Sequence, residues 1–101
     1  MKDIESKLQE KWAGMGFSCK LWTDPPGQTW ENYIHDVDEV VHVVEGTMEF
    51  EIAGKKNILK SGDEAFIPAK TYHSVRNIGG TTSKWFYGYK NNPSQGISKP
   101  A

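Results

Sequence analysis

Several features that would place this chain in a specialised class of protein are missing from its sequence. It has one cysteine, Cys19, so no disulfide can form within the chain and nothing indicates an oxidising compartment. The 12 basic residues nearly balance the 13 acidic ones, and a net charge of −1 is no signature of nucleic-acid or anionic-membrane binding. The start, MKDIESKLQEKW, lacks the apolar region of a signal peptide, and no apolar run reaches membrane-spanning length. We therefore expect a cytoplasmic protein without nucleic-acid or membrane partners.

The length and composition are typical of one small globular domain. The chain has 101 residues, of which 37% are hydrophobic, and it contains neither an internal repeat nor a linker that would divide it. We predict a single domain over residues 1–101. A chain this short buries only part of its apolar surface, so association into an oligomer would add to its stability.

Residues 4–13 have the pattern of a short amphipathic helix. Asp3 precedes it as a candidate N-cap and Gly14 follows it. Its apolar residues recur every four positions, at Ile4, Leu8 and Trp12. Two placements fit this stripe, a lid on the protein's own β-core and a dimer contact. We favour the lid, because most amphipathic helices pack on their own domain.

Beyond the helix, the period of the apolar pattern changes to two, which indicates β-strands. Turns rich in glycine and proline separate short strands predicted at residues 17–23, 28–34, 39–45, 48–52, 57–60, 64–67, 72–78 and 82–90. There is no alternation of strands with helices, so the sequence predicts an all-β sandwich or barrel over residues 17–90. Residues 91–101 carry little that is apolar, and we expect a loosely ordered tail there.

Two of these strand regions supply candidate metal ligands. His35 and Glu39 are four residues apart, and an even spacing in β structure sends both side chains to one face. His73 lies in a similar setting in the strand predicted at 72–78. Two histidines and a carboxylate inside a small β-fold are a candidate metal site. The alternative is that they are interior polar groups that satisfy one another by hydrogen bonds. His42 has the opposite parity and is expected to point outward.

These residues belong to two spaced patterns. The first pattern consists of Gly27, His35, Glu39 and Gly46, and the second of Gly62, Pro68, His73 and Asn77. In order and spacing the patterns resemble the two motifs of the cupin superfamily, with eight of ten motif positions matched. Tyr33 stands where the first motif has another histidine, and Lys70 stands where the second has its middle glycine.

The resemblance implies a fold, a cofactor and an assembly. The fold would be a double-stranded β-helix, the jelly-roll barrel of cupins, and a small single-domain cupin of this kind would form a homodimer. In cupins with the full motif, three histidines and a glutamate bind a divalent metal. Carried over to this chain, the ligands of Fe, Mn, Ni or Zn would be His35, Glu39 and His73. Tyr33 is either a weak fourth ligand or a ring that fills the space of the missing histidine.

Other side chains are candidates for a ligand pocket. We predict that Tyr33, Trp30 and Val41 line it. Further aromatic residues line the same pocket or, as we favour, fill the core, namely Tyr72, Trp85, Phe86, Tyr87 and Tyr89. Arg76 and Lys70 either anchor an anionic group at the barrel mouth or are solvated surface charges. Cys19 is expected to be a small buried hydrophobe and not a nucleophile.

Three functions fit this set of residues, and we rank them in the following order. The first is a metal-dependent enzyme that acts on a small organic molecule as an oxygenase or an isomerase, since two histidines and a carboxylate are also the ligands of non-haem Fe(II) oxygenases. The second is a non-catalytic cupin that binds or senses a small ligand. The third is a structural or interaction domain with a vestigial site.

Overall fold

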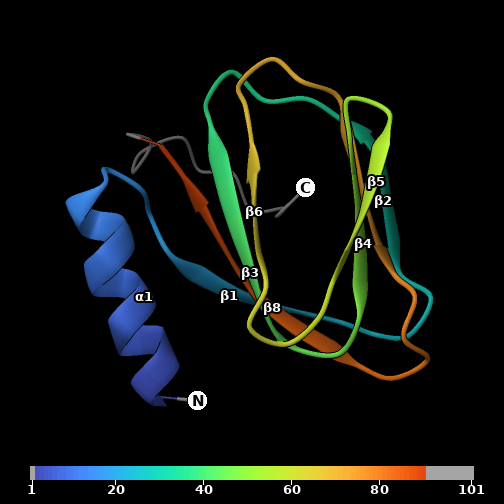
Figure 1. The fold of residues 1–101 in the computed structure, drawn as a ribbon, viewed down its shortest axis with the longest axis horizontal. Helices are drawn as coiled ribbons and strands as arrows, with labels where there is room; N and C mark the ends of the chain where they lie inside the picture. The colour runs from blue at the N-terminus through green and yellow to red at the C-terminus, as the bar shows by residue number, and fades with distance from the viewer. Residues whose placement is uncertain (1, 91–101) are drawn as a thin grey trace.

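The computed structural model describes residues 2–90, which contain one helix and eight strands (Figure 1). The elements are α1 Lys2–Gly14, β1 Lys20–Asp24, β2 Thr29–Tyr33, β3 Glu39–Glu45, β4 Met48–Ile52, β5 Lys55–Leu59, β6 Glu64–Ile67, β7 His73–Asn77 and β8 Ser83–Tyr89. The bounds of β3, β4 and β6 are those predicted, and the other strands differ at their ends. The strand predicted from residue 17 begins at Lys20, and Phe17 forms an isolated bridge with Lys90. The predicted tail lies outside the described residues.

The strands form two four-stranded antiparallel sheets that face each other (Figure 1). The strand order is β1-β8-β3-β6 in one sheet and β2-β7-β4-β5 in the other. Apart from the β4–β5 hairpin, neighbours in each sheet are distant in the sequence, which is the arrangement of a jelly roll and confirms the predicted fold class. The two strands that begin with motif residues, β3 and β7, are both central strands of their sheets.

The core lies between the two sheets and is built from alternate residues of their strands. In β3, the alternation turns Glu39, Val41 and Val43 inward, and all three are essentially inaccessible. His42 has the outward parity that was expected, but its side chain is still buried, and its Nδ1 lies 2.7 Å from Glu64 Oε2.

Helix α1 packs on the outer face of the β1-β8-β3-β6 sheet, which is the lid arrangement favoured above (Figure 1). A second apolar cluster forms there from Leu8, Trp12, Phe17, Val40 and Phe86. Phe86 therefore belongs to the helix-covered cluster and not to the space between the sheets. No helix among residues 2–90 is long and apolar enough to cross a membrane.

Candidate metal centre

Two neighbouring loops and the strands that follow them bring the predicted ligands together. Glu39 and His73 are the first residues of β3 and β7, and His35 lies in the loop between β2 and β3. The backbone N–H of Lys70 donates to the carbonyl of His35 over 2.6 Å, which ties this loop to the one before β7. Lys70 has a φ of +59°, so the lysine adopts the left-handed conformation usually supplied by a glycine. Lys70 therefore adopts the backbone conformation that the motif's glycine would adopt.

The three side chains converge on a small volume in the interior. Glu39 Oε1 lies 3.6 Å from His73 Nε2 and 3.8 Å from His35 Nε2, and the three donor atoms all lie within 4.8 Å of one another. Two ligands of one ion at about 2.1 Å are themselves roughly 3–4 Å apart. The side chains of Glu39 and His73 are 1% exposed, and that of His35 is 13% exposed. The spacing is therefore that of ligands around one metal ion.

Two of these atoms are buried without a hydrogen-bond partner among residues 2–90. They are Glu39 Oε1 and His73 Nε2. An unsatisfied buried polar atom costs about 1–3 kcal/mol, so such atoms are rare and call for an explanation. The alternative, that these residues satisfy one another by hydrogen bonds, does not account for the two unpartnered atoms. A metal ion bound by both atoms does account for them, and the residues present fit such an ion.

The surroundings of His73 prepare it as a ligand. Its Nδ1 lies 3.2 Å from the carbonyl oxygen of Thr71, which accepts the Nδ1 proton and leaves the lone pair of Nε2 facing the site. Burial lowers the pKa of His73, the Thr71 carbonyl opposes this effect, and the nearby His35 adds to it. The neutral imidazole, which is the form that binds metals, is therefore favoured. Burial also raises the pKa of Glu39 well above its usual range, because the interior disfavours the charged carboxylate.

Tyr89, which the sequence placed among aromatic residues of the pocket or the core but not among the metal-site residues, also reaches this site. Tyr89 pairs with Glu39 in the β3–β8 register, and its hydroxyl lies 3.5 Å from His35 Nε2. Tyr87 and Tyr89 are each 4% exposed, and burial together with the charge of Glu39 raises both of their pKa values. Their shared parity with Trp85 in β8 was the available signal. It marked them only as interior aromatic residues.

The predicted pocket residues lie beside the site in the second sheet and the core. Tyr33 pairs with His73, and its ring packs edge-on against Trp30, with 6.3 Å between ring centroids. Both rings are partly buried against the core, and Val41 is fully buried within it. Their role in ligand binding stays a prediction.

Two of the other candidates lie away from the interior. Arg76 forms ion pairs with three glutamates on the sheet that contains β7, namely Glu31, Glu49 and Glu51. It is therefore engaged in a network of acidic partners and does not serve as an open anion anchor. Cys19 is partly buried beside the helix-covered cluster, and burial, reinforced by the charge of Glu5, raises its thiol pKa to about 11. Such a thiol is a poor nucleophile at neutral pH, as expected.

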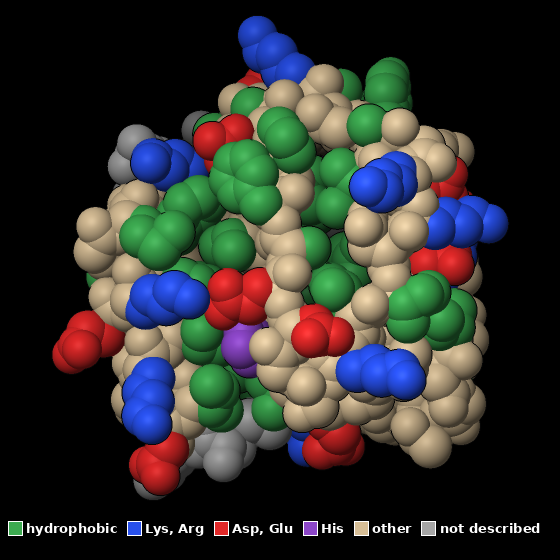
Figure 2. Space-filling view, in the orientation of Figure 1, with side chains coloured by type: hydrophobic (Ala, Val, Ile, Leu, Met, Phe, Trp, Pro, Cys, Tyr) green, Lys and Arg blue, Asp and Glu red, His purple; other side chains and the backbone are tan. Residues whose placement is uncertain are grey.

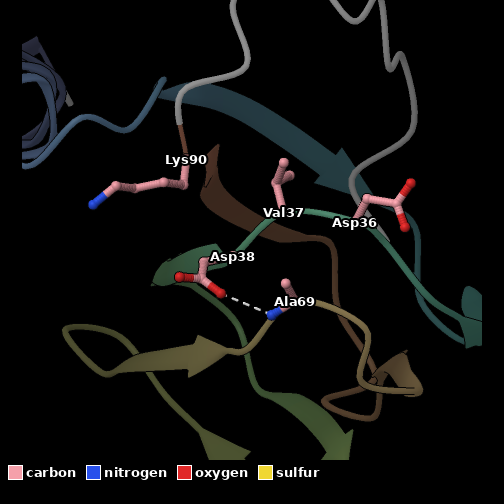
Figure 3. Close-up of a pocket in the computed structure, with 5 residues that line it drawn as sticks. All are labelled: Asp36, Val37, Asp38, Ala69 and Lys90. Carbon is pink, nitrogen blue, oxygen red and sulfur yellow. Dashed lines mark hydrogen bonds between the residues drawn. The ribbon is translucent and has the colours of Figure 1, made fainter.

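A hollow of about 270 Å³ lies beside the loop that joins His35 to Glu39. It is lined by Asp36, Val37, Asp38, Ala69 and Lys90. Figure 3 shows the Asp38 carboxylate turned toward the Ala69 N–H, which donates to it over 2.8 Å, while the Asp36 and Lys90 side chains point away from each other. Three of the lining residues fill the loop between His35 and Glu39. The sequence patterns gave no sign of this hollow.

The fold agrees with what the comparisons with known proteins find. The cupin domain family matches residues 20–89, so the chain belongs to the cupin family. No curated protein matches the chain. Among solved structures, a protein of Thermus thermophilus is similar, with 25% identity, a TM-score of 0.67 and coverage of 73% of this chain and 72% of the other.

Two further structures share the fold. An RmlC-like cupin from Shewanella frigidimarina is 19% identical, with a TM-score of 0.70 and coverage of 78% of this chain and 69% of the other. A predicted oxalate decarboxylase from Thermotoga maritima is 22% identical, with a TM-score of 0.68 and coverage of 80% of this chain and 72% of the other. At these identities the likeness concerns the fold alone.

Proposed function

We propose that this cupin binds a divalent metal ion through His35, Glu39 and His73 and uses it in a reaction on a small organic molecule. The observation that carries this proposal is the pair of buried, unpartnered atoms, Glu39 Oε1 and His73 Nε2, which lie 3.6 Å apart. When bound, the metal would polarise a substrate oxygen or activate water or dioxygen. Iron, manganese, nickel and zinc all suit imidazole and carboxylate ligands.

The chain's own residues limit what the reaction can be. Three protein ligands leave further coordination positions for substrate, which is the arrangement of oxygenases and of other enzymes that bind substrate at the metal. Glu39 and His73 are almost completely buried, so the surrounding core excludes water from two of the three ligands. One solved structure with a similar fold is named a predicted oxalate decarboxylase, and this name supports a small, oxygen-rich substrate for the present chain. We propose an oxygenase or an isomerase.

The test is metal-dependent stabilisation of the full chain. Chelator-treated protein is titrated separately with manganese, iron(II), nickel and zinc, and the melting temperature and bound metal are measured. At a metal concentration of about 100 Kd the stabilisation is about 2.7 kcal/mol, or roughly 10–20 °C for a domain of this size. Glu39→Ala and His73→Ala should lose the shift. The control His42→Ala, which alters a histidine on the outer face, should keep it. Absence of both bound metal and a shift in the wild type would refute the proposal.

The hollow of Figure 3 favours a second candidate function, the binding of a small ligand without chemistry. Its lining includes both acidic and basic side chains, so a ligand of mixed polarity would fit. A thermal screen of chelator-treated protein tests this candidate. A ligand that stabilises the metal-free protein and is recovered unchanged supports it, and stabilisation that always requires metal speaks against it.

We also propose that the chain works as a homodimer in the cytoplasm. Large apolar side chains are exposed on the described residues and offer surface for a second copy; among them are Phe66 at 53%, Tyr72 at 63% and Ile58 at 49%. Sedimentation equilibrium would measure the assembly, and a monomer at micromolar concentration would contradict the proposed homodimer.

Figure 2 shows basic and acidic side chains interspersed on one face, which suits neither a nucleic acid nor an anionic membrane.

A further inference from the structure

The hydroxyl of Tyr89 reaches the candidate metal centre from a strand that carries neither motif. It lies 3.5 Å from His35 Nε2, and that nitrogen lies 3.8 Å from Glu39 Oε1. A strong hydrogen bond between such groups would be about 2.7–3.2 Å long, whereas groups arranged around a common third atom are roughly 3–4 Å apart. The Tyr89 hydroxyl therefore lies at the distance expected of a group that contacts the same bound molecule as the metal ligands.

Tyr89 is held in this position from several sides. Its ring packs edge-on against His35 and Tyr87, with centroid distances of 5.1 and 5.7 Å. Its backbone N–H donates to Ser18 Oγ over 3.0 Å, and its carbonyl accepts the Ser18 N–H over 3.1 Å. A side chain fixed in this way is a preorganised donor, because little further ordering is needed when a ligand binds.

The charges at the centre determine the kind of ligand that Tyr89 would meet. His35 and His73 are neutral when they bind a metal, and Glu39 contributes one negative charge. A divalent ion would therefore leave the buried centre with one uncompensated positive charge, which favours an anionic ligand. A hydrogen bond from a neutral hydroxyl to a charged acceptor is stronger than one between neutral groups. A tyrosine hydroxyl has a reference pKa of about 10, so it is protonated at neutral pH and able to donate.

We propose that the Tyr89 hydroxyl donates a hydrogen bond to a small organic anion that binds at the centre through an oxygen atom, such as a carboxylate or an enolate. Tyr89 thereby selects anionic oxygen ligands over neutral ones. This inference rests on the proposed function, because it requires a metal at His35, Glu39 and His73.

The experiment measures anion binding to the cobalt(II)-loaded full chain, with acetate as the probe. Visible absorption of cobalt(II) reports acetate binding, and competition with a chelator reports cobalt affinity. We expect Tyr89→Phe to weaken acetate binding about tenfold or more and to change cobalt affinity by less than about threefold. Tyr87→Phe is the matched control, because it removes a neighbouring hydroxyl from a side chain that is equally buried. It should leave both affinities within about threefold of the wild type.

Each other outcome overturns part of the argument. Unchanged acetate affinity in Tyr89→Phe, or an equal loss in Tyr87→Phe or Tyr33→Phe, refutes the assignment to Tyr89. A large loss of cobalt affinity in Tyr89→Phe makes this residue a ligand and not a donor. Cobalt binding without any acetate binding to the wild type refutes the anion class and leaves the proposed function standing. A wild type that takes up no cobalt refutes the proposed function, and this inference with it.

Discussion

Trp85 donates its indole N–H to Asp24 Oδ2 over 2.9 Å in the interior of the protein. The other carboxylate oxygen accepts two more indoles, from Trp22 at 2.8 Å and from Trp30 at 3.2 Å. Asp24 is 1% exposed and lies opposite Ser83, at the end of β8 remote from Tyr89. Trp30 belongs to one sheet and the other two tryptophans to the second. One carboxylate therefore joins the two sheets at the end away from the candidate metal centre.

Asp24→Ala should destabilise the protein by about 2–5 kcal/mol, because it leaves indole donors without an acceptor and opens a cavity among them. Urea denaturation followed by circular dichroism measures the loss. Asp36→Ala is the control, since Asp36 is exposed, and its effect should stay within about 0.5 kcal/mol. A loss below about 1 kcal/mol for Asp24→Ala would show that the three indoles find other partners.

Gly88→Ala should separate helix α1 from the sheet. A Cβ at Gly88 would overlap the carbonyl oxygen of Ser18 and lie 3.0 Å from the ring of Trp12. Overpacking against backbone is not easily relieved, and we expect a loss of about 3 kcal/mol with increased solvent exposure of Trp12, seen by fluorescence quenching. Gly14→Ala is the control, because nothing lies within 4 Å of its added Cβ, and it should be neutral or slightly stabilising. Equal stabilities for the two variants would contradict the close approach at Gly88.

Glu39→Gln should stabilise the metal-free protein while abolishing its response to metal. The carboxylate is buried and its Oε1 has no hydrogen-bond partner among residues 2–90, whereas an amide at this position can donate to His73 Nε2. We expect a gain of about 1–2 kcal/mol in chelator-treated protein, measured by thermal denaturation. The same change at the exposed Glu45 should alter neither property. If Glu39→Gln instead destabilises the metal-free protein, the carboxylate has a structural role of its own.

Cys19 should react slowly with thiol reagents below pH 10. Burial, with a smaller contribution from Glu5, raises its pKa to about 11, above a reference value of about 8.5. Because the folded value is the higher one, the thiol's contribution to stability is complete below about pH 8 and is lost as the pH rises toward 11.

The rate of Cys19 labelling by a disulfide reagent should therefore rise about tenfold per pH unit from pH 8 to pH 10 in the folded protein. In concentrated urea the labelling rate should level off at a pH near the reference pKa, so the unfolded chain serves as the control. A plateau near about pH 8.5 in the folded protein would mean that the thiol is more exposed than the structure indicates.

The chain's local patterns were enough to predict its strands and the three candidate ligands. The bounds of β3, β4 and β6 followed from the alternation of apolar residues, because side chains on a strand point to opposite faces in turn. The even spacing of His35 and Glu39 predicted one face of a strand, but His35 lies in the loop before β3, so the loop and not strand alternation brings it to within 3.8 Å of Glu39. The second motif supplied His73. Lys70 looked like a departure from the motif, yet its φ of +59° shows that the backbone conformation is retained.

By itself, the sequence determined the period of each element, the class of fold and most of the side chains that belong to its interior. Tyr72, predicted to line the pocket or fill the core, is instead 63% exposed, because it lies in the loop before β7. Only the tertiary structure decided which of those interior side chains meet. Trp85 and Asp24 are separated by 61 residues, and Tyr89 and His35 by 54. Alternation is a property of one strand, whereas these contacts depend on which strands pair and in what register. A register shift of one residue would turn Tyr89 away from the site, and no local pattern fixes that register.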